Sequence, residues 1–590
     1  MFPQPNHGRR AVTLIAVTCT ICTLITCASI SQAQDFERYR PNPPVPGRSI
    51  PELPELPDEP VEGSTDEIVK ELKGIMIVDH ESMVQDPIKP FEGVKIHPAA
   101  DLTVAREQAL KDVLAPYLGQ PISIRALNEM AKNIVLLYRE YKQPVVDVSM
   151  PPGQDITDGV VQVVITESRI GQIEFRGNCW FDDCLLEQQS WLRSGQRIYE
   201  PCLQQELVWY NKNPFREVGV KLEPGDLPGT TDIVYEVTEQ RPVRFYMGYE
   251  DTGTRVTGLE RLTFGANWGN AWGKDRQLSY QYTTDADLSG AIGVHSVVYS
   301  VPIFENRDTW TVFGSWADIS SQVPGGPGLN NEGRAWQVSG RYTHMLCENK
   351  CRQDSMHFGI DFKGTNSNLD FGGATTFASD VHVVQFMAGI NSRQVYEDGQ
   401  TSYGLDVFLS PGHLLTNNTS DAFDVVRRGA KSTYGYARGQ IERLYEIDHR
   451  SDFVVRGTGQ IGSYKLLPTE QLGFGGFNTI RGYDMRTLNG DSGYIINLEY
   501  RSKPIQRCCN GRETSLTFLA FTDMGQQFNW GPKQLNLNGI SSEILASAGV
   551  GFRYLVNPNA TIRFDYGYPI TRKLAQNDHG RFHIGAVLAY

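Results

Sequence analysis

The residues of this 590-residue chain that could do chemistry are arginines and carboxylates, not nucleophiles or metal ligands. It has no H-E-x-x-H zinc motif, no G-x-S-x-G nucleophile elbow and no G-x-x-x-x-G-K-[ST] phosphate loop, and its eleven histidines are scattered. We therefore expect no enzyme, no cofactor and no metal site. The arginine of greatest interest is Arg481, because it lies in a long glycine-rich stretch, GGFNTIRGYDMRTLNGDSGY, at residues 475–494.

This stretch belongs to a connection that runs from about Tyr464 to Ser492 between two strand-like segments. Connections of this length in an ordered domain are usually functional or disordered. In a confined site an arginine needs an anion, because removing one partner of a buried ion pair costs about 3–5 kcal/mol. Gly482 would let the chain turn tightly beside it. An ordinary exposed loop arginine is the alternative.

The elements that must position this loop are strands. From Arg241 to the C-terminus helical periodicity is absent, and segments of roughly ten residues alternate in polarity, as in QLSYQYT, where Leu278, Tyr280 and Tyr282 alternate with polar residues. A soluble sandwich also alternates, but it rarely carries so many aromatic residues on one side. An outer-membrane barrel turns that side to lipid and keeps a polar lumen. We therefore predict a transmembrane β-barrel over residues 241–590.

Sixteen antiparallel strand candidates can be counted in this region, from RFYMGYED to FHIGAVLAY, and bacterial barrels have an even number. Short turns such as AWGKDR and NPNA would lie inside the cell envelope and longer connections outside. The last strand ends on Tyr590, with Phe582 on the same face. A terminal aromatic residue on such a strand resembles the signal by which outer-membrane barrels are recognised for insertion.

Two units precede the barrel. Residues 72–168 and 169–240 share one order of elements, which is strand, helix, helix, strand, strand, and we interpret it as an internal duplication of an α+β domain. A generic small α+β domain is the alternative. In the helix ALNEMAKNIVLLYREYK one stripe is predicted to be buried, formed by Leu127, Met130, Ile134, Leu137 and Tyr141.

The N-terminus has the pattern of an exported protein. Two arginines, an apolar run and a small-x-small site ending at Ala33 predict a signal peptide over residues 1–33. A lipoprotein signal ending at Cys27 is the weaker alternative. Residues 34–71, dense in proline and acidic residues, predict an extended linker with one short helix in STDEIVKELKG.

The composition excludes other classes. The net charge of −13 argues against a nucleic-acid partner, which needs a basic face. No other window offers the roughly 18 uninterrupted apolar residues of a membrane helix, and the mean hydropathy is −0.34. A helical membrane protein is therefore excluded.

The exported part of the chain holds an odd number of cysteines, so at least one stays unpaired. They are Cys179, Cys184, Cys202, Cys347, Cys351, Cys508 and Cys509. Disulfides persist in oxidising compartments, and Cys347 and Cys351 in CENKC are candidates for a bridge across a tight turn. A metal site is far less expected, because no histidine lies at ligand spacing beside these cysteines.

Two motifs carry a resemblance to the superfamily of translocation proteins that join POTRA domains to a barrel. One is its [VI]RG[YF] tip of the sixth extracellular loop, and the other its F-x-D-x-G motif in the thirteenth strand. The matching residues are Ile480, Arg481, Gly482 and Tyr483 in the first motif and Phe521, Asp523 and Gly525 in the second.

The resemblance implies that the loop folds back into the lumen and that Arg481 pairs with Asp523. Tyr483 would pack against the wall. Glu499, which strand parity also turns inward, is a secondary acceptor; that it is merely one of many lumen charges is the alternative.

With two POTRA-like units and sixteen strands, the chain is most similar to two-partner secretion transporters, the haemolysin and filamentous-haemagglutinin exporters. This resemblance implies a bacterial outer-membrane location, with the N-terminal domains in the periplasm. It also implies passage of an unfolded client, a large β-helical adhesin or haemolysin, through the lumen. Outer-membrane lipid and the barrel-insertion machinery would be the other partners. An assembly factor of the same superfamily and a porin or receptor are the alternatives.

Capture of the client is expected at an exposed POTRA sheet edge, where main-chain bonds give affinity with little sequence demand. The strands VGVKLEP and IVYEVTE and the groove beside CLQQELVWYNKN are the candidates. The N-terminal segment departs from the family pattern, in which a helix plugs the pore, because here the stretch is rich in proline. Either DEIVKEL plugs the pore or nothing helical does.

Overall fold

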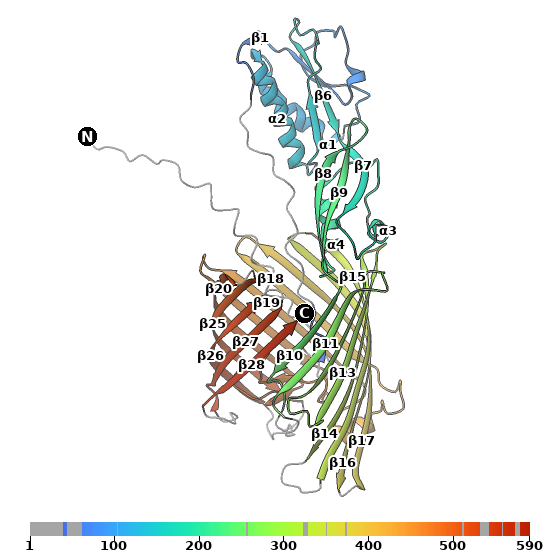
Figure 1. Cartoon of the computed structure of the whole chain (residues 1–590), viewed down its shortest axis with the longest axis vertical. Coiled ribbons are helices and arrows are strands. Elements are labelled where there is room, and N and C mark those ends of the chain that lie inside the picture. The colour runs from blue at the N-terminus through green and yellow to red at the C-terminus, as the bar shows by residue number, and fades with distance from the viewer. Residues whose placement is uncertain are drawn as a thin grey trace, which may run out of the picture. The chain divides into compact units, whose positions relative to one another are not determined.

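The structure is a computed structural model of the chain. It describes residues 39–43, 62–102, 104–254, 258–322, 329–349, 351–371, 374–509, 512–530, 542–556, 559–572 and 579–590. The predicted signal peptide and most of the predicted linker lie outside these residues. The chain divides into two compact units (Figure 1), Ile50–Asn211 with Arg216–Thr238, and Met1–Ser49 with Lys212–Phe215 and Glu239–Tyr590.

The first N-terminal domain is a four-stranded sheet with two main helices packed on one face. Its sheet has the order β3-β2-β6-β5, in which β2 pairs in parallel with β3 and β6, and β5 is antiparallel to β6. The elements are β1 (Glu67–Val69), β2 (Gly74–Val78), the 3-10 turn η2 (Glu81–Met83), β3 (Gly93–Ile96), α1 (Val104–Leu114), η3 (Ala115–Tyr117), β4 (Ile122–Ser123), α2 (Ile124–Glu140), β5 (Val146–Ser149) and β6 (Val160–Glu167).

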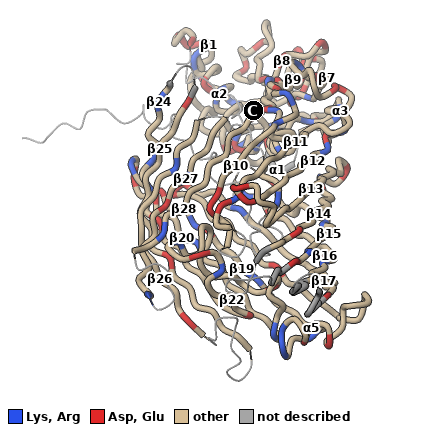
Figure 2. Tube along the Cα trace, turned by 60° about the horizontal axis from the view of Figure 1, so that its bottom comes forward, with Lys and Arg blue, Asp and Glu red and all other residues tan. Residues whose placement is uncertain are grey.

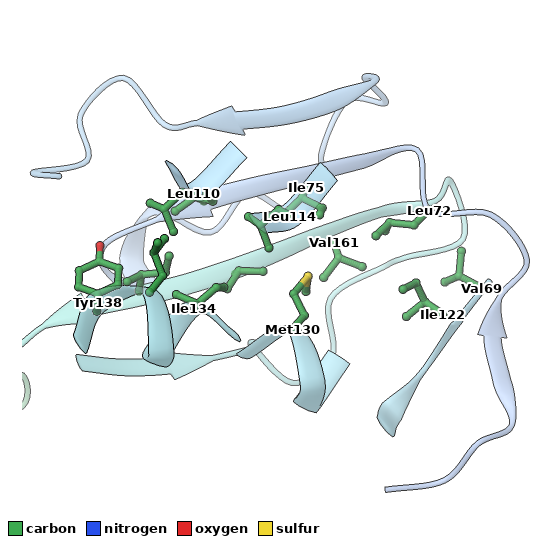
Figure 3. Close-up of a cluster of buried hydrophobic side chains, with 14 residues drawn as sticks. Val69, Leu72, Ile75, Leu110, Leu114, Ile122, Met130, Ile134, Tyr138 and Val161 are labelled. Atoms are coloured by element: carbon green, nitrogen blue, oxygen red, sulfur yellow. The ribbon is translucent and has the colours of Figure 1, made fainter. Parts of the chain in front are cut away.

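Helix α2 begins at Ile124, two residues before the stretch predicted to be helical. The Ser123 hydroxyl accepts a hydrogen bond from the Ala126 N–H at 3.2 Å, which caps the helix. Met130, Ile134 and Tyr138 are buried in the core that Figure 3 shows. The prediction that Tyr141 ends the buried stripe is wrong, because the helix ends at Glu140 and Tyr141 is exposed; Tyr138, one turn earlier, is buried instead.

The short helix predicted in residues 64–74 is not formed. Glu67–Val69 is strand β1, which pairs with β4, and both Val69 and Leu72 are buried in the core of the first domain. A helix this short is marginal in water unless tertiary packing supports it, whereas the extended segment that contains β1 buries two apolar side chains. DEIVKEL therefore belongs to this domain, and the helix on which the plug alternative depended is not formed.

The second N-terminal domain is a three-stranded sheet with the order β7-β9-β8. Its elements are β7 (Arg169–Arg176), α3 (Asp183–Glu187), α4 (Glu200–Tyr210), β8 (Arg216–Pro224) and β9 (Thr230–Glu239). The rings of Phe175 and Tyr235 stack with centroids 5.1 Å apart, and Tyr210 of α4 packs edge-on against both. In the part of the chain that the structure describes, no helix has the length and apolar character required to cross a membrane.

The C-terminal unit is a closed antiparallel barrel, in which β10 and β28 pair and lie side by side (Figure 1). Its strands are β10 (Val243–Glu250), β11 (Arg261–Ala271), β12 (Arg276–Asp285), β13 (Ile292–Ile303), β14 (Asp308–Gln322), β15 (Leu329–Glu348), β16 (Arg352–Phe371), β17 (Ala374–Tyr396), β18 (Gly399–Ser410), β19 (Tyr434–Glu446), β20 (Ser451–Gly462), β23 (Ser492–Ser502), β24 (Ile505–Cys509), β25 (Arg512–Phe528), β26 (Ser542–Val556), β27 (Ala560–Pro569) and β28 (Arg581–Ala589).

The barrel has sixteen strands among the described residues, because β23 and β24 are one strand interrupted at Lys503 and Pro504. Both segments pair with β25, where the partners of Arg501 and Ile505 are Leu519 and Leu516. The predicted sixteen-stranded transmembrane barrel is therefore confirmed. Each of the sixteen strand candidates corresponds to one strand of the structure.

The strands place apolar side chains outside and polar side chains inside, as predicted. Phe245, Trp310 and Phe582 are exposed on the outer surface, whereas Gln337 and Gln385 are fully buried within the barrel. Acidic and basic residues are interspersed along the strands (Figure 2). Strands β15, β16 and β17 are the longest of the described strands, at 20, 20 and 23 residues.

The C-terminal residue completes the pairing of the first and last strands. The Tyr590 N–H donates to the Phe245 carbonyl at 2.8 Å, and the Phe245 N–H donates to the Tyr590 carbonyl at 2.9 Å. The Tyr590 side chain is exposed. Its role as an insertion signal, together with Phe582, stays a prediction.

The expected bridge between Cys347 and Cys351 is not formed in the structure, where both cysteines are free. Asn349 closes this turn instead: its side-chain oxygen accepts the N–H groups of Cys351 and Arg352, at 3.0 and 2.7 Å. An asparagine that bonds the backbone two and three residues ahead supplies the tight turn without a covalent link.

We predict that Leu72→Ala destabilises the first domain by about 2–5 kcal/mol, because it removes a fully buried side chain from the core. Urea denaturation of the periplasmic fragment, followed by circular dichroism, would measure the change. Leu136→Ala is the matched control, since Leu136 is 43% exposed on the same domain. Equal stability of the two variants would show that Leu72 belongs to a linker.

Candidate functional site in the barrel lumen

The connection between β20 and β23, residues 463–491, folds into the barrel. Its two short strands, β21 (Leu472–Phe474) and β22 (Leu488–Gly490), pair as a hairpin, and the tip between them is buried. Arg481 at this tip is only 3% exposed. The loop therefore occupies the lumen, and we refer to residues 463–491 as the lumen loop.

Arg481 makes a two-pronged contact with Asp523 of β25. Its Nε donates to one carboxylate oxygen at 2.7 Å and its Nη2 to the other at 2.8 Å. The Arg481 backbone N–H also donates to the same carboxylate at 3.1 Å. Asn497 of β23 adds a fourth donor at 2.8 Å. This geometry is the bidentate pairing for which arginine, not lysine, is suited.

The three residues of the F-x-D-x-G motif each serve the loop tip differently. The Phe521 ring lies 3.5 Å from the Arg481 guanidinium carbon, as a cation–π contact, while Asp523 supplies the anion. Gly525 leaves room for Ile480, whose Cδ1 would be 3.0 Å from any Cβ built at that glycine. On one face of β25 the motif thus provides a ring that stacks on the guanidinium, a carboxylate that neutralises its charge, and room for the neighbouring isoleucine.

Glu499 of β23 is a second partner of Arg481, with an Oε1 to Nη1 distance of 2.8 Å. It also pairs with Arg501 at 2.5 Å and with Arg456 at 3.3 Å. An arginine stays protonated in proteins. Asp523 and Glu499 therefore neutralise a charged guanidinium in the lumen.

The motifs did not reveal two wall residues near the tip. Asp565 of β27 lies 3.7 Å from the Arg481 Nη1 and pairs at 2.9 Å with both Arg553 and Arg563. Nε2 of His583, on β28, accepts the Gly482 N–H at 3.0 Å. The alternation of polar and apolar residues along the last two strands could have identified both residues, since both fall on the inward face of their strands.

Gly482 and Gly567 let the loop backbone contact the wall backbone. Gly482 has φ of 91°, a left-handed conformation that favours glycine. A Cβ built on Gly567 would lie 2.4 Å from the Gly482 nitrogen, which no side-chain rotation can relieve. Tyr483, the next residue, places its hydroxyl 2.8 Å from the Ala546 carbonyl and 2.9 Å from that of Thr571.

The base of the lumen loop is held by two further ion pairs that sequence reasoning missed. Glu470 pairs with Lys363 of β16 at 2.8 Å, and both side chains are buried. Asp491 pairs through both oxygens with Arg427, which follows helix α5 (Ser420–Val426) in the connection between β18 and β19. These partners are 107 and 64 residues apart in sequence, so no local pattern marks them.

Comparison with known proteins gives the same architecture. Residues 229–554 match the model of the haemolysin secretion/activation protein family ShlB/FhaC/HecB, and residues 94–168 match that of the ShlB-type POTRA domain. The chain is 20% identical over 495 residues to the heme/hemopexin transporter protein HuxB of Haemophilus influenzae, covering 82% of this chain and 84% of HuxB. It is 23% identical over 501 residues to the outer membrane transporter CdiB-2 of Burkholderia pseudomallei, covering 81% and 79%.

Solved structures share the fold. CdiB from Escherichia coli superposes with a TM-score of 0.68 at 17% identity, over 91% of this chain and 93% of CdiB. BamA from Haemophilus ducreyi, lacking POTRA domains 1–3, superposes with a TM-score of 0.51 at 14% identity, over 83% and 98%.

We predict that Gly567→Ala displaces the loop tip from the barrel wall, because the added methyl group would clash with the Gly482 backbone. Trypsin added to native outer membranes should then cleave after Arg481 or Arg486, which the native chain protects. Gly340→Ala on β15 is the matched control, since a Cβ there meets nothing within 4 Å. Continued protection of the Gly567→Ala variant would contradict the close backbone contact.

Proposed function

Because the chain belongs to the haemolysin secretion/activation protein family of ShlB, FhaC and HecB, it is an outer-membrane transporter of two-partner secretion, and we propose that it exports one partner protein, of large β-helical adhesin or haemolysin type. The POTRA-type domains lie in the periplasm and the barrel in the outer membrane. The partner would enter from the periplasm, unfolded, and leave at the cell surface.

The observation that carries this proposal is the lumen loop held by buried ion pairs inside a closed barrel. A barrel built for small solutes needs an open polar channel, whereas this one anchors a long loop to its wall at both tip and base. The partner would therefore pass beside the loop as an extended chain. The sequence has no phosphate-binding motif, so folding of the partner outside would drive export.

We infer that capture in the periplasm uses the free edge of β8. The strand IVYEVTE, one of the predicted candidates, is β9 and lies in the middle of its sheet, so its main chain is already paired. β8 is an edge strand. The groove beside α4 is less favoured, because Leu203, Leu207 and Trp209 of that helix are already buried.

The pattern of hydrogen bonds tells which β8 groups face outward. The Gly225 N–H donates to the Thr230 carbonyl at 3.0 Å, so in an antiparallel pair the odd-numbered residues face β9. The even-numbered Val218 bonds instead to the Asn211 side chain, through both its N–H and its carbonyl. Val220 and Leu222 are next on this outward-facing edge, where an incoming strand would pair.

The other partners follow from the outer-membrane location. Lipid would contact the outer apolar surface of the barrel, and the barrel-insertion machinery would recognise the strand that ends at Tyr590. If the chain were an assembly factor, deletion of its gene would lower the amounts of many barrel proteins in the outer membrane. If it were a porin, deletion would alter only the uptake of solutes. Comparison of the culture medium with and without the gene separates the three: the proposed function requires the loss of one secreted protein.

We predict that Arg481→Ala reduces export at least about tenfold, because it leaves the buried Asp523 carboxylate without its cationic partner, a cost of about 3–5 kcal/mol. The amount of the secreted partner in the medium would be measured, with heat-modifiable mobility on gels as the check that the barrel is inserted. Arg481→Lys keeps the charge but not the two-pronged geometry, and should be intermediate. Normal secretion by Arg481→Ala would rule out a role for the loop tip.

We predict that Val220→Pro lowers binding of the partner's unfolded N-terminal segment to the periplasmic domains, because proline removes one outward N–H from the β8 edge. Val220→Ala, which keeps the N–H, is the matched control. Calorimetric titration of the periplasmic fragment would measure the difference. Equal affinity of the two variants would exclude capture at this position of the edge.

A further inference from the structure

Residues Tyr39–Pro43, with the sequence YRPNP, lie against the inner wall of the barrel. The residues that contact them come from β10 to β14, and strand parity places these on the lumen side. Residues 41–43 are not helical, and prolines at 41 and 43 keep a chain extended. Of the described residues of this segment, Tyr39 is in a 3-10 turn, and residues 41–43 lie in the lumen outside any helix.

The wall binds this segment chiefly through its main chain. The Asn42 N–H donates to the Tyr246 hydroxyl at 3.0 Å and to the Gln281 Oε1 at 3.2 Å. The Asn42 carbonyl accepts the Asn267 Nδ2 at 3.1 Å. One wall amide therefore accepts and another donates at the same residue, as a neighbouring strand would do.

Two more wall groups continue this pattern along the segment. The Gln281 Nε2 donates to the Tyr39 carbonyl at 3.2 Å, and the Arg244 Nη1 donates to the Pro43 carbonyl at 3.2 Å. Side-chain contacts are looser: Arg40 lies over the Phe313 ring at 5.9 Å, and Tyr39 packs against an apolar cluster. Bonds to backbone groups place little demand on sequence, so the same wall can bind other extended chains.

The four wall groups are pre-arranged by bonds to one another. The Tyr246 hydroxyl donates to the Gln281 Oε1 at 2.8 Å, and the Arg244 Nη1 donates to the Asn267 Oδ1 at 3.2 Å. Asn267 also donates to the Ser279 hydroxyl at 2.9 Å. Fixed donors and acceptors lose little freedom when a peptide binds, which favours binding.

The segment and the lumen loop use different parts of the wall. The ion pairs and the hydrogen bond that hold the lumen loop to the wall fall on β16 to β28, whereas the segment contacts β10 to β14. The loop is held by buried charges, and the segment chiefly by neutral hydrogen bonds, which individually contribute less. Of the two, the segment is therefore the one that an incoming chain displaces at lower cost.

We propose that Arg244, Tyr246, Asn267 and Gln281 form a binding track for the main chain of an extended, unfolded polypeptide, and that Tyr39–Pro43 occupies this track until the exported chain replaces it. The proposal rests on the proposed function, because it names the wall along which the partner passes. It assigns these four residues to the binding of any extended chain, not to one sequence.

The test uses the full chain in planar lipid bilayers. Residues 39–43 are replaced by Gly-Ser-Gly-Ser-Gly to vacate the track, and the probe is an uncharged random-coil peptide of Pro, Ala and Ser added on the periplasmic side. We expect this peptide to block the current. Adding Asn267→Ala and Gln281→Leu should weaken the block about tenfold, because several main-chain hydrogen bonds are lost.

Gln400→Leu is the matched control, since it removes an inward amide from β18, outside the strands that hold the segment. Gln281→Glu keeps the acceptor and loses the donor, and should weaken the block less than the double variant. Heat-modifiable mobility confirms that each variant is folded. If the peptide blocks the double variant as strongly as the parent, or if Gln400→Leu weakens the block equally, the proposed binding track is wrong.

Export assays on the same variants keep the two proposals apart. If the native chain exports no partner, the proposed function fails, while the peptide block still tests the track. If the double variant loses the block but exports normally, the track is not the route and the proposed function stands. Loss of both the block and export is the result expected.

Discussion

A charged guanidinium inside a narrow barrel must be neutralised where it lies, and the pairing of Arg481 with Asp523 meets this requirement. The surrounding residues follow from it: Phe521 stacks on the cation, Gly525 makes room for the neighbouring Ile480, and Gly482 lets the backbone reach the wall. A buried ion pair contributes little net stability, because desolvation offsets the attraction. What the pair supplies is a defined position for the loop.

The loop is fixed at its base as firmly as at its tip. Glu470 with Lys363, and Asp491 with Arg427, hold the two ends of the hairpin formed by β21 and β22. A segment tied at both ends behaves as part of the wall. The lumen is therefore narrowed by a fixed element, and any change of its free cross-section must come from a segment held less firmly.

The barrel could be predicted from the sequence because lipid requires the same alternation of apolar and polar residues in every strand, and all sixteen strands show it. Two short motifs also sufficed to place Arg481 beside Asp523. Prediction failed where local pattern competes with tertiary packing, as in Glu67–Val69, which pairs with Ile122–Ser123 instead of forming a helix. It also missed Lys363 and Glu470, because a single pair of charges 107 residues apart has no periodicity to reveal it.

The unequal strand lengths of the barrel have a geometric consequence. About ten residues per strand suffice to cross a bilayer, yet β15 and β16 each have twenty residues. At one end of these strands the positions that continue the outward face of Trp336 and Phe358 are polar and unsuited to lipid. They are Glu332 and Arg334 of β15 and Asn366 of β16, the partner of Arg334. This part of the cylinder must project into water as an overhang. A polypeptide leaving the mouth is consequently sheltered on one side by protein and open to the membrane surface on the other.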